Sequence, residues 1–544
     1  MRRPRLSLWL LALCLPAAAS QTTRVSVAHG VELTQIVISA AEPGGPELIH
    51  VLSVKPAEHG IRMEASLGGG TVEEPGGGME AVNHQVLRTG ALAGINADFF
   101  PYTGDPLGLE IHNGELVSEP ANGCGAFGLT IGGKTVFGRP VFEAEVTAED
   151  GARVALNGLN RKQGDGELIL FAPVYGERTP DKAATVAVLE ASKPTPRAGS
   201  IMDAVVTALS DEAGAVAIPK KGLVLTGTGA AAGWLKSHAA SGKRIRIRTD
   251  IVDGGKDWAA VREAVSGRPI ILSAGKEDLE LEREHVAADF STTRHPRSAV
   301  GVKNDGTVLI VAVDGRQALS RGMSLPELAA AMKGLGAVDA LNLDGGGSTC
   351  LSVRGLVINC PSDGQVRKVA DALLVFDDSL KITPGGSLDA RGGEPSDLPS
   401  DGSRQNVAHP AGLKAGLWGT LNGGAFVGQD AGLYGYKPGR ATVAAMDPAG
   451  KVVLNRTYNV LPGPAGKMLL AWNEGTLRIT IRDVNNNPVK GQEIILTKPG
   501  GTQTEVATGA DGRADVPKGW LKDEKEAVTL VSGVLTRTWP APTT

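Results

Sequence analysis

TVLIVAVDGRQALSRGMSLPELAAAMKGLGAVDALNLDGGGS, residues 307–348, has the clearest structural pattern in the chain. Residues 307–313 are a nearly continuous apolar run, typical of a strand buried on both faces. Ser324-Leu325-Pro326-Glu327 has the form of a helix-capping box, and Gly334 and Gly336 end the helix that follows. A second apolar run, 338–343, predicts another strand.

A strand, a helix and a strand at this spacing predict a βαβ unit with parallel strands. Parallel strands end at one edge of a sheet, where open α/β sheets bind ligands. Asp314 and Asp344 each follow one of the strands and are therefore expected to face one crevice. The predicted fold class is an α+β mixed-sheet catalytic domain containing this βαβ unit, followed by C-terminal all-β immunoglobulin-like modules.

The loop after the second strand is a candidate anion site. Glycines without Cβ atoms can turn their N–H groups toward one point, and a serine adds a hydroxyl donor, as in Gly345, Gly346, Gly347 and Ser348. The loop leads into a further strand, which excludes a P-loop and a dinucleotide fingerprint, since both open a helix. The alternatives are a tight turn for this loop and a hairpin turn for Asp314-Gly315.

Two other segments place polar side chains beside short strands. Alternation puts Asn96 and Asp98 on one face, although both residue types also bond to neighbouring backbone at strand ends. Arg297 precedes the strand expected at 299–302 and is suited to hold a phosphate through two parallel hydrogen bonds. The alternative for the arginines here is a surface ion pair. Glu327 is assigned to helix capping first.

Composition sets the broad class of protein. The 544 residues suggest about three domains, and 73 Gly with 32 Pro favour many turns and β-structure. The net charge of -4 offers no strongly basic face for nucleic acid or an acidic membrane surface. We therefore expect neither nucleic-acid binding nor membrane insertion.

The N-terminus predicts export. Basic residues 1–5, the apolar run 6–15 and the small residues 17–20 form the pattern of a cleaved signal peptide over residues 1–20. The apolar run is too short for a permanent membrane anchor. The mature protein is expected to be secreted, either periplasmic or extracellular.

Three cysteines remain after signal cleavage. Cys350 and Cys360 lie symmetrically about Arg354-Gly355, so a hairpin there would place them opposite one another. In an oxidising compartment a cross-strand disulfide is then feasible, and two buried thiols are the alternative. Cys124 has no evident partner.

The remaining pattern divides the chain into domains. Residues 24–380 are expected to form the large mixed domain, and the Gly-, Pro-, Ser- and Asp-rich residues 381–406 a linker. Residues 407–462 contain short strand-like runs and predict a small β module. Residues 465–544 alternate clearly, as in Leu477-Arg478-Ile479-Thr480-Ile481, and predict an immunoglobulin-like sandwich acting as a spacer or docking module.

Several segments together resemble the phosphodiester glycosidase family over about residues 24–378. The matching segments are 94–100 (GINADFF), 106–108 (PLG), 295–301 (HPRSAVG), 313–316 (VDGR), 324–329 (SLPELA), 341–349 (LNLDGGGST), 361–364 (PSDG) and 372–375 (ALLV). The chain departs from the family at Ser266-Gly267-Arg268-Pro269 and at Asp371, where an Asn is usual. Cys350 and Cys360 replace polar residues, which favours the disulfide.

The resemblance implies hydrolysis of the bond between an anomeric carbon and a phosphodiester. Such cleavage passes through an oxocarbenium-like state that carboxylates serve, while fixed donors hold the phosphate charge. We predict Asp314, Asp344 and Arg297 as catalytic residues. The substrate-binding residues are predicted to be Asn96, Asp98, Arg316, Asn342, Gly345, Gly346, Gly347 and Ser348. The expected substrate is a sugar-1-phosphodiester or phosphoglycan, with association to a surface or cell wall through the C-terminal modules.

Two rival functions use the same residues. Asp98, Asp314 and Asp344 together offer oxygen ligands for Ca²⁺ or Mg²⁺, which leaves a metal-dependent phosphodiesterase open. A non-catalytic, cell-surface glycan-binding protein is the other alternative, although binding alone does not require paired carboxylates.

Overall fold

The structure is a computed structural model that describes residues 20–540 except 57, 59, 74–77, 102, 103, 122, 192, 387, 389–392 and 414. The predicted signal peptide lies outside these residues apart from Ser20. The described part is mainly β-structure and contains four short α-helices: α1 (Val82–Thr89), α2 (Gly229–His238), α3 (Ala288–Thr292) and α4 (Leu325–Gly334). None of its helices is long and apolar enough to cross a membrane.

An eight-stranded sheet contains both strands of the segment 307–348. Its strands are, in spatial order, β1 (Gln21–Ala28), β2 (Val31–Ile38), β3 (Glu47–Val54), β23 (Val308–Val313), β22 (Arg297–Lys303), β24 (Ala337–Leu343), β20 (Ile270–Ser273) and β21 (Lys276–Glu277). Helix α4 covers one face, packing Leu328 and Met332 against apolar residues of the strands. The capping box of Ser324 and Glu327 is present as predicted.

The predicted βαβ unit and the α+β class are wrong. The helix and both strands form, but β22 lies between β23 and β24 and is antiparallel to each of them. An apolar run reports burial on both faces and not the direction of the neighbouring strand, so the sequence pattern did not distinguish the two arrangements. Because β23 and β24 still run in the same direction, both end at one edge of the sheet, where β22 begins.

A second sheet packs against the first. Its core strands are β26 (Leu356–Val357), β25 (Leu351–Val353), β6 (Ala93–Asn96), β28 (Asp371–Asp377) and β4 (Ile61–Leu67). Val300 and Ile310 of the first sheet share one buried cluster with Ile95 and Leu373 of the second. This two-sheet core brings the end of β6 next to the ends of β23 and β24.

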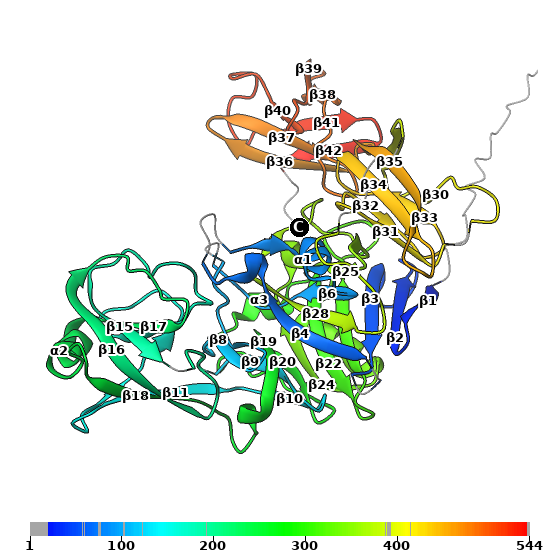
Figure 1. The fold of residues 1–544 in the computed structure, drawn as a ribbon. Helices are drawn as coiled ribbons and strands as arrows, with labels where there is room; N and C mark the ends of the chain where they lie inside the picture. Colours follow the sequence, from blue (N-terminus) through cyan, green and yellow to red (C-terminus); the bar gives the residue numbers. More distant parts are fainter. Residues whose placement is uncertain are drawn as a thin grey trace, which may run out of the picture.

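Residues 141–252, which are inserted in sequence between strands of the core, form a separate lobe, called the inserted lobe below (Figure 1). Its eight-stranded sheet includes β11 (Val141–Ala148), β18 (Arg244–Val252), β16 (Ser200–Ala213), β15 (Ala184–Ala191) and β17 (Gly222–Gly227), and α2 packs on it. A five-stranded sheet, β10 (Thr135–Gly138), β9 (Gly125–Thr130), β19 (Val261–Gly267), β7 (Glu110–His112) and β8 (Glu115–Ser118), lies between this lobe and the core.

The C-terminal part adds strands to the second core sheet. β31 (Leu417–Thr420) pairs with β26 through Val357 and Thr420, and β34 (Gly439–Met446), β35 (Val452–Pro462) and β29 (Ser396–Ser400) follow it in the same sheet. Strand β29 lies within the predicted linker. Residues 467–539 form two further sheets around their own apolar cluster, at the top of Figure 1. One contains β36 (Lys467–Asn473), β37 (Thr476–Arg482) and β40 (Arg513–Asp515), and the other β39 (Gln503–Ala507), β38 (Glu493–Thr497), β41 (Val528–Ser532) and β42 (Leu535–Trp539).

The predicted disulfide is not formed in this structure. β25 and β26 make the expected hairpin at Arg354-Gly355, but Ser352 pairs with Val357 and Val353 with Leu356. This register continues to Asn359, not Cys360, opposite Cys350. The offset of one residue sends the thiols of Cys350 and Cys360 into different apolar clusters, and both are free and buried.

Candidate active site

The ends of three core strands meet at the glycine-rich loop. Arg297 at the start of β22 pairs with Val313 at the end of β23, and Ser298 pairs with Leu343 at the end of β24. The Asp344 amide then donates to the Ala97 carbonyl at 2.8 Å, which joins the loop to the segment after β6. The ends of β23 and β24 and the start of β22 therefore lie at one edge of the sheet.

The glycines of this loop are required by close packing. A Cβ atom on Gly345 would lie 2.6 Å from the Pro296 carbonyl oxygen, and Gly346 has a left-handed φ of 62°. Most loop amides already donate within the protein: Gly345 to the Asp344 carboxylate at 2.9 Å, Gly346 to Pro296 at 2.9 Å and Ser348 to Gly345 at 3.1 Å. The loop therefore shapes the site, and anion binding depends mainly on other groups.

Asp344 is the predicted carboxylate that remains partly open to solvent. Burial raises its pKa to about 6, and the Ser348 hydroxyl, the Gly345 N–H, Arg367 and Arg268 act in the opposite direction. Asp344 is therefore ionised at neutral pH, and its negative charge lies beside the positive charges of Arg367 and Arg268.

Asp98 lies beside Asp344 and is held from two sides. Its Oδ1 accepts from the Phe99 amide at 2.7 Å and its Oδ2 from the Gly108 amide at 2.6 Å. Burial and, to a smaller extent, the charge of Asp344 raise its pKa to about 7, while the two N–H groups and Arg268 act in the opposite direction. The two carboxyl groups thus have different tendencies to ionise, as acid–base pairs do.

Three arginines surround the Asp344 loop. Arg367 donates to the Ser348 hydroxyl at 3.3 Å and pairs with Asp363. Arg316 is exposed and has a left-handed φ of 62°. Its Nη2 lies 3.0 Å from Nδ1 of His295. Arg268 lies 5.2 Å above the Phe99 ring. Among the described residues, no carboxylate lies within ion-pairing distance of Arg268 or Arg316.

Arg297 lies beneath this surface and is fully buried. Its guanidinium donates to the backbone carbonyls of Met323, Phe290 and Thr293 at 2.8, 2.8 and 3.0 Å, while Nη1 has no partner among the described residues. Burial and the charge of Arg316 lower its pKa to about 10. Arg297 therefore mainly ties α3 and the segment before α4 to the site.

Asp314 also lies below the surface, with its side chain 1% exposed. Its Oδ2 accepts from His50 Nε2 at 2.9 Å, and its Oδ1 accepts from the Cys360 amide at 2.9 Å and the Asn359 side chain at 3.2 Å. Both oxygens are therefore occupied by protein groups. Asn359 also donates to Thr349, so Asp314 supports the strand that follows the glycine loop.

The predicted asparagines have similar supporting positions. Buried Asn96 donates to the Asp344 carbonyl at 2.6 Å and accepts from the Ser298 hydroxyl at 2.8 Å and the Cys350 amide at 3.1 Å. Asn342 donates to the Arg268 carbonyl at 2.6 Å. These contacts fix the backbone on both sides of Asp344.

Four residues of this region were not predicted as site residues: Arg268, Arg367, Asp371 and Glu110. Asp371 accepts from the Asp98 amide at 2.8 Å, while its other oxygen and both oxygens of Glu110 are buried without a partner among the described residues. Burial and then the neighbouring carboxylates raise the pKa of Glu110 and of Asp371 well above the usual range. The buried setting and the mutual repulsion of these carboxyl groups therefore favour the neutral forms of Glu110 and Asp371. The departures from the family at 266–269 and at Asp371 were the signals that pointed here.

The three predicted carboxylate ligands do not form a metal site. No three His, Cys, Asp or Glu side chains in the described ranges are arranged to ligate one. Asp314 is turned toward His50, Asn359 and Cys360, so the proposed trio with Asp98 and Asp344 does not converge on one point.

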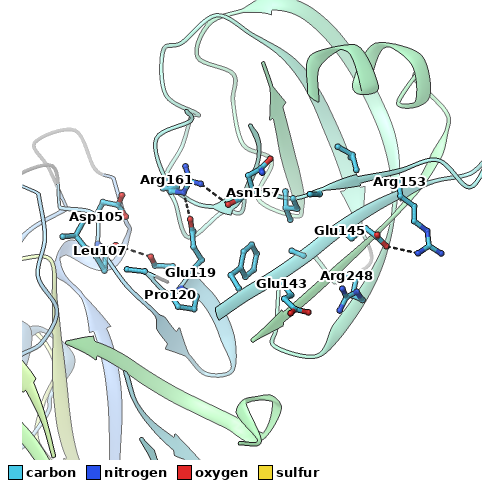
Figure 2. Close-up of a pocket in the computed structure, with 18 residues that line it drawn as sticks. Asp105, Leu107, Glu119, Pro120, Glu143, Glu145, Arg153, Asn157, Arg161 and Arg248 are labelled. Atoms are coloured by element: carbon cyan, nitrogen blue, oxygen red, sulfur yellow. Dashed lines mark hydrogen bonds and ion pairs between the residues drawn. The ribbon is translucent and has the colours of Figure 1, made fainter. Parts of the chain in front are cut away.

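A groove of about 770 Å³ lies between the core and the inserted lobe (Figure 2). Leu107 and Pro120, which flank β7 and β8 of the five-stranded sheet, line it on one side, and Phe142 and Arg248 line it from the lobe. The Glu119–Arg161 ion pair lies at one end. The Leu107 amide donates to the Phe99 carbonyl at 3.0 Å, and the next amide, of Gly108, donates to Asp98. One loop thus borders both the groove and the Asp98 carboxylate.

Comparison with known proteins finds relatives for part of the chain. Residues 198–376 match the model of the phosphodiester glycosidase family. A prophage-derived uncharacterized protein, YomE of Bacillus subtilis, is 42% identical over 82 residues, 15% of this chain and 13% of that protein. The mouse N-acetylglucosamine-1-phosphodiester alpha-N-acetylglucosaminidase is 36% identical over 74 residues, 14% of each chain. The matches thus span about a seventh of these curated relatives.

Two crystal structures resemble the fold. A putative exported protein from Burkholderia pseudomallei superposes with a TM-score of 0.52 at 26% identity, covering 63% of this chain and 76% of that one. A hypothetical protein from Synechocystis gives a TM-score of 0.56 at 23% identity, covering 66% and 64%.

Proposed function

Residues 198–376 belong to the phosphodiester glycosidase family, and on that premise we propose that the protein hydrolyses the glycosidic bond of a sugar-1-phosphodiester. The observation that supports this most directly is the partly exposed carboxylate of Asp344 next to Arg268 and Arg367. A glycosyl phosphate needs both groups, because positive charge develops at its anomeric carbon while negative charge leaves on the phosphate.

In this proposal Asp344 acts on the anomeric carbon, as nucleophile or as base for water. Arg268, Arg316 and Arg367 hold the phosphate, and Asp98 in its protonated form supplies a proton to the leaving oxygen. The bond between the anomeric carbon and oxygen breaks, and the leaving oxygen takes the proton of Asp98. Water supplies a hydroxyl to the carbon, and its second proton passes through Asp344 or solvent back to Asp98. Asp314 and Arg297, which the sequence suggested as catalytic, have supporting roles in this proposal. Asp314 faces His50, Asn359 and Cys360 in the buried layer, and Arg297 donates to backbone carbonyls beneath the site.

The finer assignments are also proposals. The basic and apolar N-terminal pattern supports an exported protein acting on phosphoglycans. The sugar named in the mouse relative, N-acetylglucosamine, is the natural first substrate to test.

The decisive experiment identifies which bond is cut in the p-nitrophenyl diester of N-acetylglucosamine 1-phosphate. We expect free sugar and p-nitrophenyl phosphate, so colour develops only after a phosphatase is added, and a chelator does not stop the reaction. Immediate colour with sugar 1-phosphate would instead identify a phosphodiesterase. Binding without turnover of this diester or of phosphoglycans would favour the glycan-binding alternative.

The pH dependence follows from the two carboxyl groups. The proposal requires Asp344 ionised, with a pKa of about 6, and Asp98 protonated, with a pKa of about 7. We therefore expect kcat/KM to rise as the pH increases through 6 and to fall as it increases through 7, with limbs that belong to the pair. Asp98→Asn should remove the alkaline limb. Activity that keeps rising to pH 9 in the unmodified protein would contradict this assignment.

A further inference from the structure

The C-terminal part of the chain reaches two loops of the candidate active site. We call residues 314–320 the Arg316 loop and residues 361–364 the Ser362 loop. The Arg316 loop presents an exposed arginine from left-handed backbone, a conformation that persists only where the surroundings fix it. The Ser362 loop leads into the Asp363–Arg367 ion pair, and Arg367 contacts Ser348.

Tyr436, in the turn before β34, contacts both loops from below. Its side chain belongs to a fully buried cluster with Leu48, Cys360 and Phe426, and the residue is 2% exposed. Its hydroxyl donates to the Ser362 carbonyl at 2.9 Å and lies 3.5 Å from the Arg316 carbonyl. One phenol oxygen therefore lies at the backbone of both loops.

A turn from the last part of the chain supplies a second contact. The side-chain oxygen of Asn485, a residue that is 3% exposed, accepts from the Ala318 amide in the Arg316 loop at 2.8 Å. Asn487 in the same turn donates to the Tyr436 carbonyl at 2.6 Å. The two contacts thus belong to one hydrogen-bonded unit.

This unit is itself rigidly held. Fully buried Asp483 accepts from the Asn485 and Asn487 amides at 2.9 and 2.8 Å, and from the Ser400 hydroxyl at 2.6 Å. Buried polar networks whose members are satisfied specify one arrangement of the chain. The network connects residues near 400, 436 and 483–487 to the loops that carry Arg316 and Arg367.

We propose that the C-terminal modules are structural components of the active site, and that Tyr436 and Asn485 are positioning residues for the phosphate-binding arginines. This inference rests on the proposed function for the role of the arginines, but the contacts themselves do not depend on it. The sequence predicted a spacer or docking module at the C-terminus. We expect instead that loosening these contacts weakens phosphate binding.

The test compares Tyr436→Phe, Asn485→Ala and the double variant with Tyr434→Phe in the full-length protein. Tyr434 is in the same module and stacks on Phe426, so it is a matched control for loss of a phenol hydroxyl. Loss of one hydrogen bond corresponds to about 3- to 10-fold in binding. We expect that increase in KM for each single variant and a larger one for the double variant, with kcat changed much less.

Two further measurements separate this inference from the proposed function. Inorganic phosphate should bind more weakly to the variants by a similar factor, and amide hydrogen exchange of residues 316–320 should be faster, with no change in Tyr434→Phe. If the protein turns over no sugar phosphodiester, these two readouts still decide the positioning role. Unchanged exchange in the loop, or faster exchange with unchanged phosphate affinity, would overturn the proposal, and Tyr436→Phe keeps the test valid should Asn485→Ala fold poorly.

Discussion

Replacement of Asp344 by Asn is expected to lower kcat/KM on a sugar-1-phosphodiester by about 10²- to 10⁴-fold, the range typical for loss of one acid–base group. The amide keeps the shape of the carboxylate and an oxygen that can accept from the Gly345 N–H, which lies 2.9 Å from the carboxylate. It loses the negative charge beside Arg367 and Arg268. Since burial disfavours that charge, the melting temperature should stay the same or rise.

Asp305→Asn is the matched control for this variant. Asp305 accepts from the Thr307 amide at 3.0 Å in the exposed turn between β22 and β23, at the opposite edge of the same sheet. Its activity should remain within about twofold of the unmodified protein, as for surface changes remote from a site. Asp344→Asn should also bind inorganic phosphate at least as tightly as the unmodified protein, because a repelling charge is gone. Full activity of Asp344→Asn would remove this residue from the mechanism.

The sequence located the elements of the core better than their pairing. The capping box at Ser324 and the strands on either side of α4 form at the predicted positions. The insertion of β22 between β23 and β24 depends on contacts between residues 298–303 and both neighbours, and no local pattern reports such contacts. The prediction that both strands end at one edge survived because it depends on their common direction alone.

The candidate site was predictable in part for a related reason. Asp344 follows a strand and precedes glycines that close packing requires, and both features are local. Arg268 and Arg367 come from other segments and reach Asp344 only through the tertiary structure. Asp314 has the same local pattern as Asp344, but its neighbour Val313 packs under α4, so the alternation of the strand turns Asp314 toward His50 between the sheets.

That difference predicts a different effect for Asp314→Ala. The substitution leaves three donors that now contact the carboxylate without their acceptor: His50 Nε2, the Asn359 side chain and the Cys360 amide. Removal of one member of a buried charged network costs about 3–5 kcal/mol of stability. We expect the free energy of the first unfolding transition in urea, followed by circular dichroism, to fall by that amount. The same free energy should be unchanged in Asp305→Ala.

The contrast with Asp344→Asn decides between support and catalysis for Asp314. Well below the transition, Asp314→Ala should lose much less kcat/KM than Asp344→Asn does, because no oxygen of Asp314 faces the arginines. Asp314→Asn should recover part of the stability, since its amide oxygen can still accept from the Cys360 N–H and its nitrogen can donate to His50 in one tautomer. If Asp314→Ala instead unfolds like the unmodified protein and loses as much activity as Asp344→Asn, then Asp314 contacts the substrate and the arrangement of the buried layer changes on binding.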